Sequence, residues 1–198
     1  AKVTPDGTIT EYPVASANDD LTAIAVGPDG NLWFTENVGN KVGKMTLSGT
    51  VTTYSIPTSA SSPGGIVNGP DGNVWFVEEG TEKIAKVTTG GSITEYPLPS
   101  GAAAQDLATG PDGNMWVTET GLNKIAKVDT SGNVLAEYPV PTASSYTVII
   151  AKGPDNNLWF TESQAGKVAK ITTSGTITEY PLAASSFPAF IVSGPDSN

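Results

Sequence analysis

The chain has 198 residues, with 20 acidic residues against ten lysines and no arginine, and a formal net charge of −10. Because a phosphate backbone is bound by clustered basic side chains, we expect no nucleic-acid partner, and cations or neutral ligands fit better. The sequence contains neither cysteine nor histidine, so it offers no disulfide, no thiolate and no imidazole base or metal ligand.

No apolar run of about 18 residues occurs, so we expect no membrane segment. No charged segment precedes an apolar one as in a signal peptide. The sequence predicts a soluble protein, and it leaves open whether Ala1 follows a removed secretory leader.

A repeat of about 42 residues runs along the whole chain. One tyrosine series keeps a spacing of 42: Tyr12, Tyr54, Tyr96, Tyr138 and Tyr180. Gly-Pro-Asp recurs at Gly27, Gly69, Gly110, Gly153 and Gly194, and a tryptophan follows the first four of these glycines six residues later, at Trp33, Trp75, Trp116 and Trp159. A fixed period of this length indicates a repeat architecture.

The first complete unit reads as four strands, over residues 21–26, 32–36, 41–47 and 50–54. Between the first two lies Pro-Asp-Gly-Asn, in which proline and glycine favour a tight turn. The second strand is apolar on both faces, as expected for a strand between two other sheets. Its tryptophan is therefore predicted to be core and not a sugar-binding platform.

The units cover residues 1–14 in part, as a third and fourth strand, residues 21–57, 63–98, 104–140 and 147–182 in full, and residues 187–198 in part, as a first strand and its turn. Four strands in about 42 residues, with no helical period, predict an all-β fold, a β-propeller of four-stranded antiparallel blades. The chain, 1–198, is then one propeller domain or a propeller fragment, with four full blades and parts of a fifth. The partial units lack one strand, so closure needs a larger ring, another chain or a three-stranded blade.

The string at 27–36, Gly-Pro-Asp-Gly-Asn-Leu-Trp-Phe-Thr-Glu, and Thr-Glu-Tyr-Pro-Leu at 178–182 resemble the repeat of the virginiamycin B lyase (streptogramin lyase) family. The NHL propellers are similar more distantly. The resemblance implies a seven-bladed ring, which takes about 294 residues at this period, whereas five blades take about 210. The sequence leaves the true blade number open.

Members of that family open the ester ring of a cyclic depsipeptide by elimination, with Mg²⁺ held by carboxylates and a histidine as base. The resemblance places that histidine at the start of the innermost strand. The matching positions here hold Thr22, Gly64, Gln105, Val148 and Ala189. No unit of this chain therefore supplies the family's base.

Glutamates end the second strand of every full unit and are predicted to ring one mouth of the propeller: Glu36, Glu78, Glu119 and Glu162. Carboxylates from neighbouring blades are ligands for Mg²⁺ or Ca²⁺. The alternative is ion pairing across the hairpin with the lysines that begin the third strand, Lys41, Lys83, Lys124 and Lys167.

Residues that differ between units are better functional candidates than those that repeat, because packing imposes the repeat. The links between units vary most. We therefore expect a small molecule or peptide to bind at the mouth near Glu78, Glu79, Gln105, Asp106, Glu119 and Tyr146.

Three functions stay open from sequence. The first is a noncatalytic ligand-binding or interaction scaffold that keeps the lyase-like repeat without its histidine. The second is a Mg²⁺-dependent carbon–oxygen lyase whose base lies in blades outside this chain or is a mouth carboxylate with a raised pKa. The third is a split or engineered propeller that several copies complete.

Overall fold

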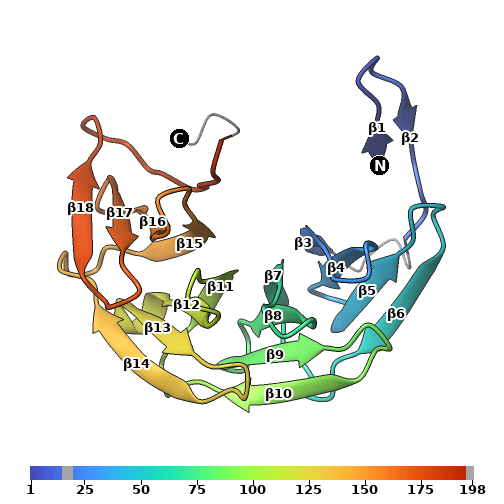
Figure 1. Ribbon diagram of the computed structural model, residues 1–198, viewed down its shortest axis with the longest axis horizontal. Coiled ribbons are helices and arrows are strands. Elements are labelled where there is room, and N and C mark those ends of the chain that lie inside the picture. The colour runs from blue at the N-terminus through green and yellow to red at the C-terminus, as the bar shows by residue number, and fades with distance from the viewer. Residues whose placement is uncertain (15–19, 195–198) are drawn as a thin grey trace.

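A computed structural model describes residues 1–14 and 20–194. Four four-stranded antiparallel sheets follow one another along the chain (Figure 1). Blade 1 holds β3 (Leu21–Val26), β4 (Leu32–Glu36), β5 (Lys41–Met45) and β6 (Val51–Ser55), and blade 2 holds β7 (Pro63–Asn68), β8 (Val74–Glu78), β9 (Lys83–Val87) and β10 (Ile93–Pro97). Blade 3 holds β11 (Ala104–Thr109), β12 (Met115–Glu119), β13 (Lys124–Val128) and β14 (Val134–Pro139), and blade 4 holds β15 (Thr147–Lys152), β16 (Leu158–Glu162), β17 (Lys167–Ile171) and β18 (Ile177–Pro181).

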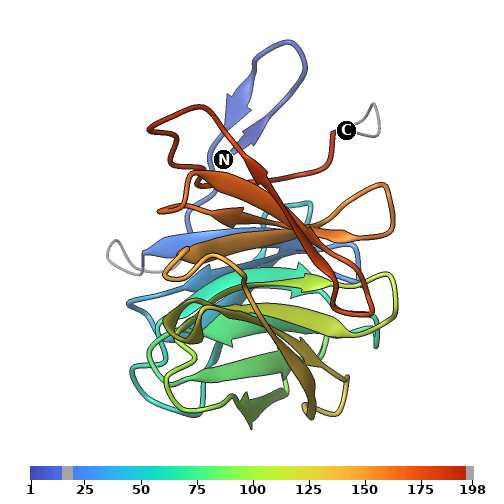
Figure 2. The same cartoon turned by 90° about the vertical axis from the view of Figure 1, so that its left-hand side faces the viewer.

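The blades stand side by side in an arc, as a propeller requires (Figures 1 and 2). The first strand of each blade lies toward the centre of the arc, and the fourth lies on its outer rim. Each strand pairs with the next in sequence, which is the meander that the repeat predicts. The predicted all-β propeller is thereby confirmed.

The N-terminal residues form the hairpin expected of a third and fourth strand, β1 (Lys2–Val3) and β2 (Ile9–Thr10). The C-terminal segment differs from the prediction, because no strand forms within residues 187–194. A single strand without a neighbour to bond has no sheet to join. Residues 195–198 of that predicted unit lie outside the described part of the chain.

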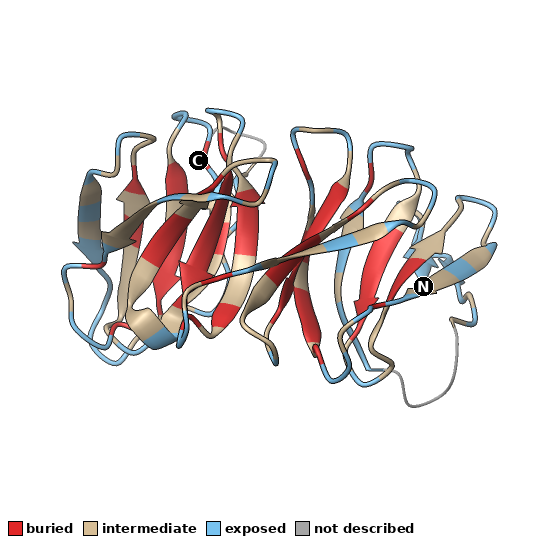
Figure 3. Ribbon diagram, turned by 90° about the horizontal axis from the view of Figure 1, so that it is seen from below, coloured by how far each residue is buried: buried red, intermediate tan, exposed pale blue. Residues whose placement is uncertain are grey.

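The buried second strands lie inside each sheet, while the turns at both ends of the strands are largely exposed (Figure 3). The indole of Trp75 is fully buried and stacks on Tyr96 of the outer strand, with ring centroids 5.5 Å apart. Asp71 of the Pro-Asp-Gly-Asn turn accepts the indole N–H of Trp75 at 2.9 Å. The same stack and the same bond recur in all four blades. Trp33, Trp75 and Trp116 are fully buried, which confirms them as core, whereas Trp159 of blade 4 is partly exposed.

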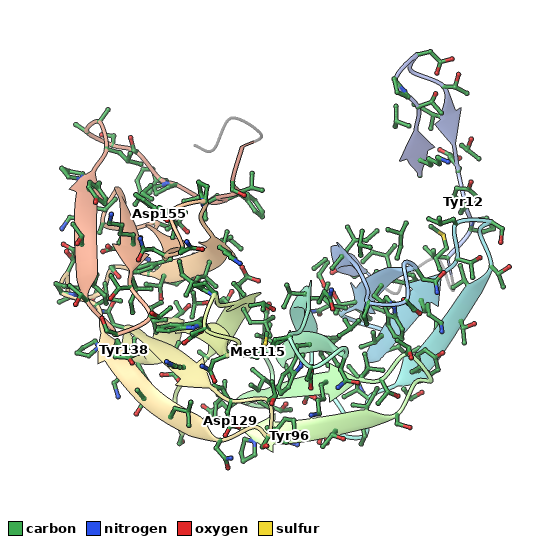
Figure 4. All side chains as sticks on the ribbon, in the orientation of Figure 1. Tyr12, Tyr96, Met115, Asp129, Tyr138 and Asp155 are labelled. Atoms are coloured by element: carbon green, nitrogen blue, oxygen red, sulfur yellow. The ribbon has the colours of Figure 1, made fainter. Side chains whose placement is uncertain are left out.

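Contacts between blades repeat as well. The second-strand hydroxyl of Thr35 donates to the carbonyl of Gly64 in the next inner strand at 2.8 Å, and Thr118 does the same to Val148 at 3.1 Å. On the outer rim, four tyrosines of the series lie against a glycine in the last turn of the following blade, as Tyr96 does beside Gly132; the others are Tyr12, Tyr54 and Tyr138. Figure 4 shows Tyr96 next to Asp129, which belongs to that turn.

No helix within the described residues is long and apolar enough to cross a membrane. The only helical element there is one 3₁₀ turn, Thr120–Leu122, between β12 and β13. An apolar hollow of about 400 Å³ lies against blade 4, where Trp159 and Val168 face the C-terminal residues Ile191 and Val192.

Candidate functional site at the propeller mouth

We use "mouth" for the face where the second strands end and the inner strands begin. Glu36, Glu78, Glu119 and Glu162 end their strands there, as predicted, but their side chains point into the blades and are fully buried. They therefore line the interior of each blade and not an open ring of carboxylates.

Among the ion pairs of the described residues, the predicted pairing of these glutamates with the facing lysines is found in blade 1 alone, where Lys41 lies 3.8 Å from Glu36. In the other blades the lysine ion-pairs with a glutamate of the outer strand instead: Lys83 with Glu95, Lys124 with Glu137 and Lys167 with Glu179. Blade 1 differs because Thr53 occupies the outer-strand position of these glutamates, opposite Gly43 as Glu95 is opposite Ala85.

The repeat is interrupted at the mouth between blades 2 and 3. Val77 replaces the threonine that bonds the next inner strand at Thr35 and Thr118, and two adjacent glycines, Gly64 and Gly65, follow Pro63 at the start of β7. A Cβ at Gly64 would overlap the carboxylate of Glu79, and a Cβ at Gly65 would overlap that of Asp106. The glycine pair thus forms a notch that two carboxyl groups fill from either side.

Asp106 connects three inner strands. It belongs to β11, its Oδ1 lies in the notch of β7, and its Oδ2 accepts the N–H of Ile150 in β15 at 3.1 Å. Burial raises the pKa of Asp106 to about 7, the backbone amides of Ile150 and Leu107 oppose that rise, and the charge of Glu79 adds to it. Burial also raises the pKa of Glu79.

Among the described residues, no hydrogen bond or ion pair of the Glu79 carboxylate is found. Half-buried and close to a second acid, this group is open to a cation or to a hydrogen-bond donor.

The remaining predicted residues divide into two groups. Gln105 lies beside Asp106 in β11 and is half-buried, while Tyr146 precedes β15 with 45% of its surface exposed and a left-handed φ of 58°. Glu78 and Glu119 lie inside their blades and are not brought to the notch. The notch glycines and Val77 were not predicted as site residues, although each departs from the repeat.

The residues present do not favour a magnesium ion. Each second-strand glutamate lies in its own blade with a lysine facing it across the hairpin. Within residues 1–14 and 20–194, no three Asp or Glu side chains gather into a group that could hold a metal. A Mg²⁺ site on these glutamates stays a prediction, and we derive no chemical step through it.

A sequence profile of the virginiamycin B lyase family matches residues 1–134. The chain belongs to this family. No curated protein sequence matches it.

Among solved structures, selenomethionine-substituted virginiamycin B lyase from Staphylococcus aureus is 38% identical with a TM-score of 0.89, over 92% of this chain and 62% of the other. A streptogramin B lyase is 36% identical with a TM-score of 0.89, over 92% and 61%. Hydrazine synthase from Kuenenia stuttgartiensis, at 20% identity, TM-score 0.76 and coverage of 96% and 57%, shares the fold alone. The chain thus spans about three fifths of the length of its lyase relatives.

The family positions noted in the sequence lie where expected. Thr22, Gly64, Gln105 and Val148 are each the second residue of an inner strand: β3, β7, β11 and β15. Ala189 lies in the C-terminal segment without strand structure.

Proposed function

We propose that this chain forms a ligand-binding mouth of the virginiamycin B lyase type and binds its ligand at the notch without converting it. The observation that carries the proposal is the pair of Glu79 and Asp106 beside Gly64 and Gly65. This pair breaks the repeat at the mouth, and the carboxylate of Glu79 is left without a bonded partner among the described residues. Its chemistry favours a small molecule or peptide that carries a positive charge or donates hydrogen bonds.

The absence of conversion follows from the missing base. Elimination needs a group that removes a proton from carbon, and the 198 residues include no histidine. A mouth carboxylate is the remaining candidate. Asp106 is held by two backbone amides inside the blades, which favours a structural role for it.

The experiment uses quinupristin, with which a catalytically inactive virginiamycin B lyase from Staphylococcus aureus has been solved. Calorimetry measures binding, and chromatography with mass detection measures conversion. Elimination yields an opened isomer of unchanged mass, whereas hydrolysis adds one water. We expect binding, no product, and an affinity at least tenfold lower for Glu79→Gln.

Glu11→Gln is the matched control, because it removes one exposed carboxylate far along the chain from the notch. Unchanged quinupristin affinity in Glu79→Gln would overturn the binding site.

A second candidate function is elimination with Asp106 as the base. Its support is the pKa of about 7, which suits a general base near neutral pH. Formation of the isomer by the wild-type chain and its loss in Asp106→Asn would establish this candidate and overturn the first. If lyase activity needs the further length that the relatives have, the 198-residue chain will be inactive although its notch is intact.

A further inference from the structure

Two contacts recur where one blade meets the next, and both join a side chain of one blade to the last turn of the following blade. The first is the fit of an outer-strand tyrosine against a turn glycine, in the pairs Tyr12 and Gly49, Tyr54 and Gly91, Tyr96 and Gly132, and Tyr138 and Gly175. The second is a hydrogen bond from a third-strand lysine to the carbonyl two residues before that glycine, from Lys44 to Thr89 and Lys86 to Thr130 at 2.8 Å, and from Lys127 to Thr173 at 3.3 Å. The two contacts together define how a blade receives the one that follows it.

Blade 4 lies at one end of the arc and carries its half of both contacts (Figure 1). Tyr180 and Lys170 hold the repeat positions of the tyrosine and the lysine. Tyr180 is 38% exposed, and no described glycine lies against it. Lys170 ion-pairs with Asp155 of its own blade, and no hydrogen bond from it to a backbone carbonyl is found among the described residues.

The apolar face of blade 4 is uncovered at the same place. In blade 3, Trp116 and Ile125 are fully buried in the cluster shared with blade 4. Their counterparts in blade 4, Trp159 and Val168, are partly exposed and line the apolar hollow of about 400 Å³. The C-terminal segment reaches this hollow with the place of a first strand in the repeat, whereas no described strand stands beside blade 4 in the place of a third or a fourth.

The hairpin of β1 and β2, at the other end of the arc, supplies the complementary half (Figure 1). Its strands are a third and a fourth strand of the repeat. Its turn glycine, Gly7, matches the glycines that receive a tyrosine, yet nothing lies within 4 Å of its Cβ position. Val3 and Ile9 of the hairpin are 63% and 64% exposed. Their counterparts in blade 3, Val128 and Val134, pack in the cluster that joins blade 3 to the preceding blade.

We propose that copies of this chain associate head to tail, with the hairpin of one copy docked beside blade 4 of another. Tyr180 then lies against Gly7 of the second copy, and Lys170 donates to the carbonyl of Pro5, two residues before that glycine. The two apolar side chains of the hairpin cover the hollow on blade 4. Such a contact joins two different surfaces, so it yields a closed ring or an open chain according to the angle between copies.

A second copy is the occupant that the contacts favour. Both halves of one repeated interface are present in the same polypeptide, and they lie at opposite ends of the arc, where they cannot meet within one copy (Figure 1). The association does not depend on the proposed function, because the notch lies between blades 2 and 3. The alternative occupant is the further length that the lyase relatives have.

The test is sedimentation velocity of the 198-residue chain at about 1 μM and about 100 μM, a range that detects weak association. We expect species larger than the monomer, and at least tenfold weaker association in Gly7→Ala. The new Cβ would overlap the ring of Tyr180, as a Cβ at Gly132 would overlap that of Tyr96. Gly72→Ala is the matched control, because this turn glycine of blade 2 has a φ of +75° against +85° for Gly7, and an equally empty Cβ position. It should associate like the wild type.

A mixing experiment tests the direction of the contact. Tyr180→Ala removes the other half of the fit and should also associate weakly by itself. An equimolar mixture of Gly7→Ala and Tyr180→Ala keeps one intact contact, between blade 4 of the first variant and the hairpin of the second. We expect this mixture to form pairs with about the wild-type affinity and nothing larger. Lys170→Gln replaces Tyr180→Ala in the mixture if loss of the stack on Trp159 unfolds blade 4.

Three results would each overturn the proposal. A wild-type chain that stays monomeric at about 100 μM would assign the two surfaces to the further length of a longer polypeptide. Equal association of Gly7→Ala and Gly72→Ala would place the contact elsewhere on the molecule. A mixture that associates no more strongly than its two components would exclude a head-to-tail arrangement.

Discussion

Asp106 occupies a position that other units fill with Ala23, Gly65 and Ile149, and it is the only charged residue of that set. Its carboxyl group lies beside the backbone of one neighbouring inner strand and accepts a hydrogen bond from the other. A single substitution in the repeat thereby connects three blades at the mouth.

The space beside Gly65 is needed for this arrangement, which yields a first prediction. In Gly65→Ala the new Cβ would overlap Oδ1 of Asp106 and lie 3.2 Å from its Cα, so the inner strands must separate. We expect a loss of about 1–3 kcal/mol in the free energy of unfolding, measured by urea titration.

Gly90→Ala is the control for this prediction. The nearest atom to its Cβ would be 3.8 Å away, and neither glycine has a left-handed φ. Equal stabilities of the two variants would show that the notch is not tightly filled.

Sequence alone predicted Asp106 and Glu79 as candidates near the varying links between units, but it could not pair them with Gly64 and Gly65. That contact crosses from β7 to β11, and its geometry depends on how two blades face each other. The same limit applies to Glu78, Glu119 and Glu162. Their spacing placed them correctly at strand ends, whereas the turn of their side chains into the blades depends on packing that the repeat does not encode.

At the scale of the strands, the repeat predicted the first unit to within two residues at each end. Turn glycines, β-branched runs and the central aromatic residues are local signals, so they are readable from sequence. The unit at 187–198 was the exception, since a strand forms through bonds to a neighbour and not through its own composition.

The fit of outer-strand tyrosines against turn glycines yields a second prediction. Gly132 has a φ of +85°, and a Cβ there would overlap the ring of Tyr96 in the preceding blade. We expect Gly132→Ala to destabilise the chain by more than the roughly 1–2 kcal/mol that a left-handed alanine costs by itself.

Gly113→Ala measures that backbone cost separately, because Gly113 has a φ of +75° and nothing within 4 Å of its Cβ position. The difference between the two variants in thermal or urea unfolding is the contribution of the Tyr96 contact. No difference would mean that the tyrosine moves aside freely.

Hydroxyl bonds between blades yield a third prediction. Thr118 donates to the carbonyl of Val148 and accepts the N–H of Asp106 at 3.0 Å. Thr118→Val should cost about 1–3 kcal/mol, because it leaves buried backbone groups unsatisfied. Thr94→Val, on the exposed side of β10, should change the unfolding free energy little, and an equal loss there would contradict this interpretation.

For the whole molecule, the sequence predicted four full blades in a propeller but not the angles between neighbouring blades. Curvature depends on the angle at which neighbouring sheets face each other, and this angle comes from interblade packing. The burial of each strand likewise depends on how neighbouring blades cover it. Every residue of β8 and β12 is buried, whereas Ile24 and Val26 of β3 are 63% and 61% exposed.

This gradient yields the last prediction, for hydrogen exchange followed by mass spectrometry. Amides of blades 2 and 3 should exchange most slowly, because neighbouring blades cover both faces of their central strands. Blade 1 should exchange faster, and the hairpin of β1 and β2 fastest, since that sheet has two strands and all its residues are exposed. Protection that is uniform from β1 to β18 would mean that the chain opens as one cooperative unit, and the graded stability inferred from burial would then be wrong.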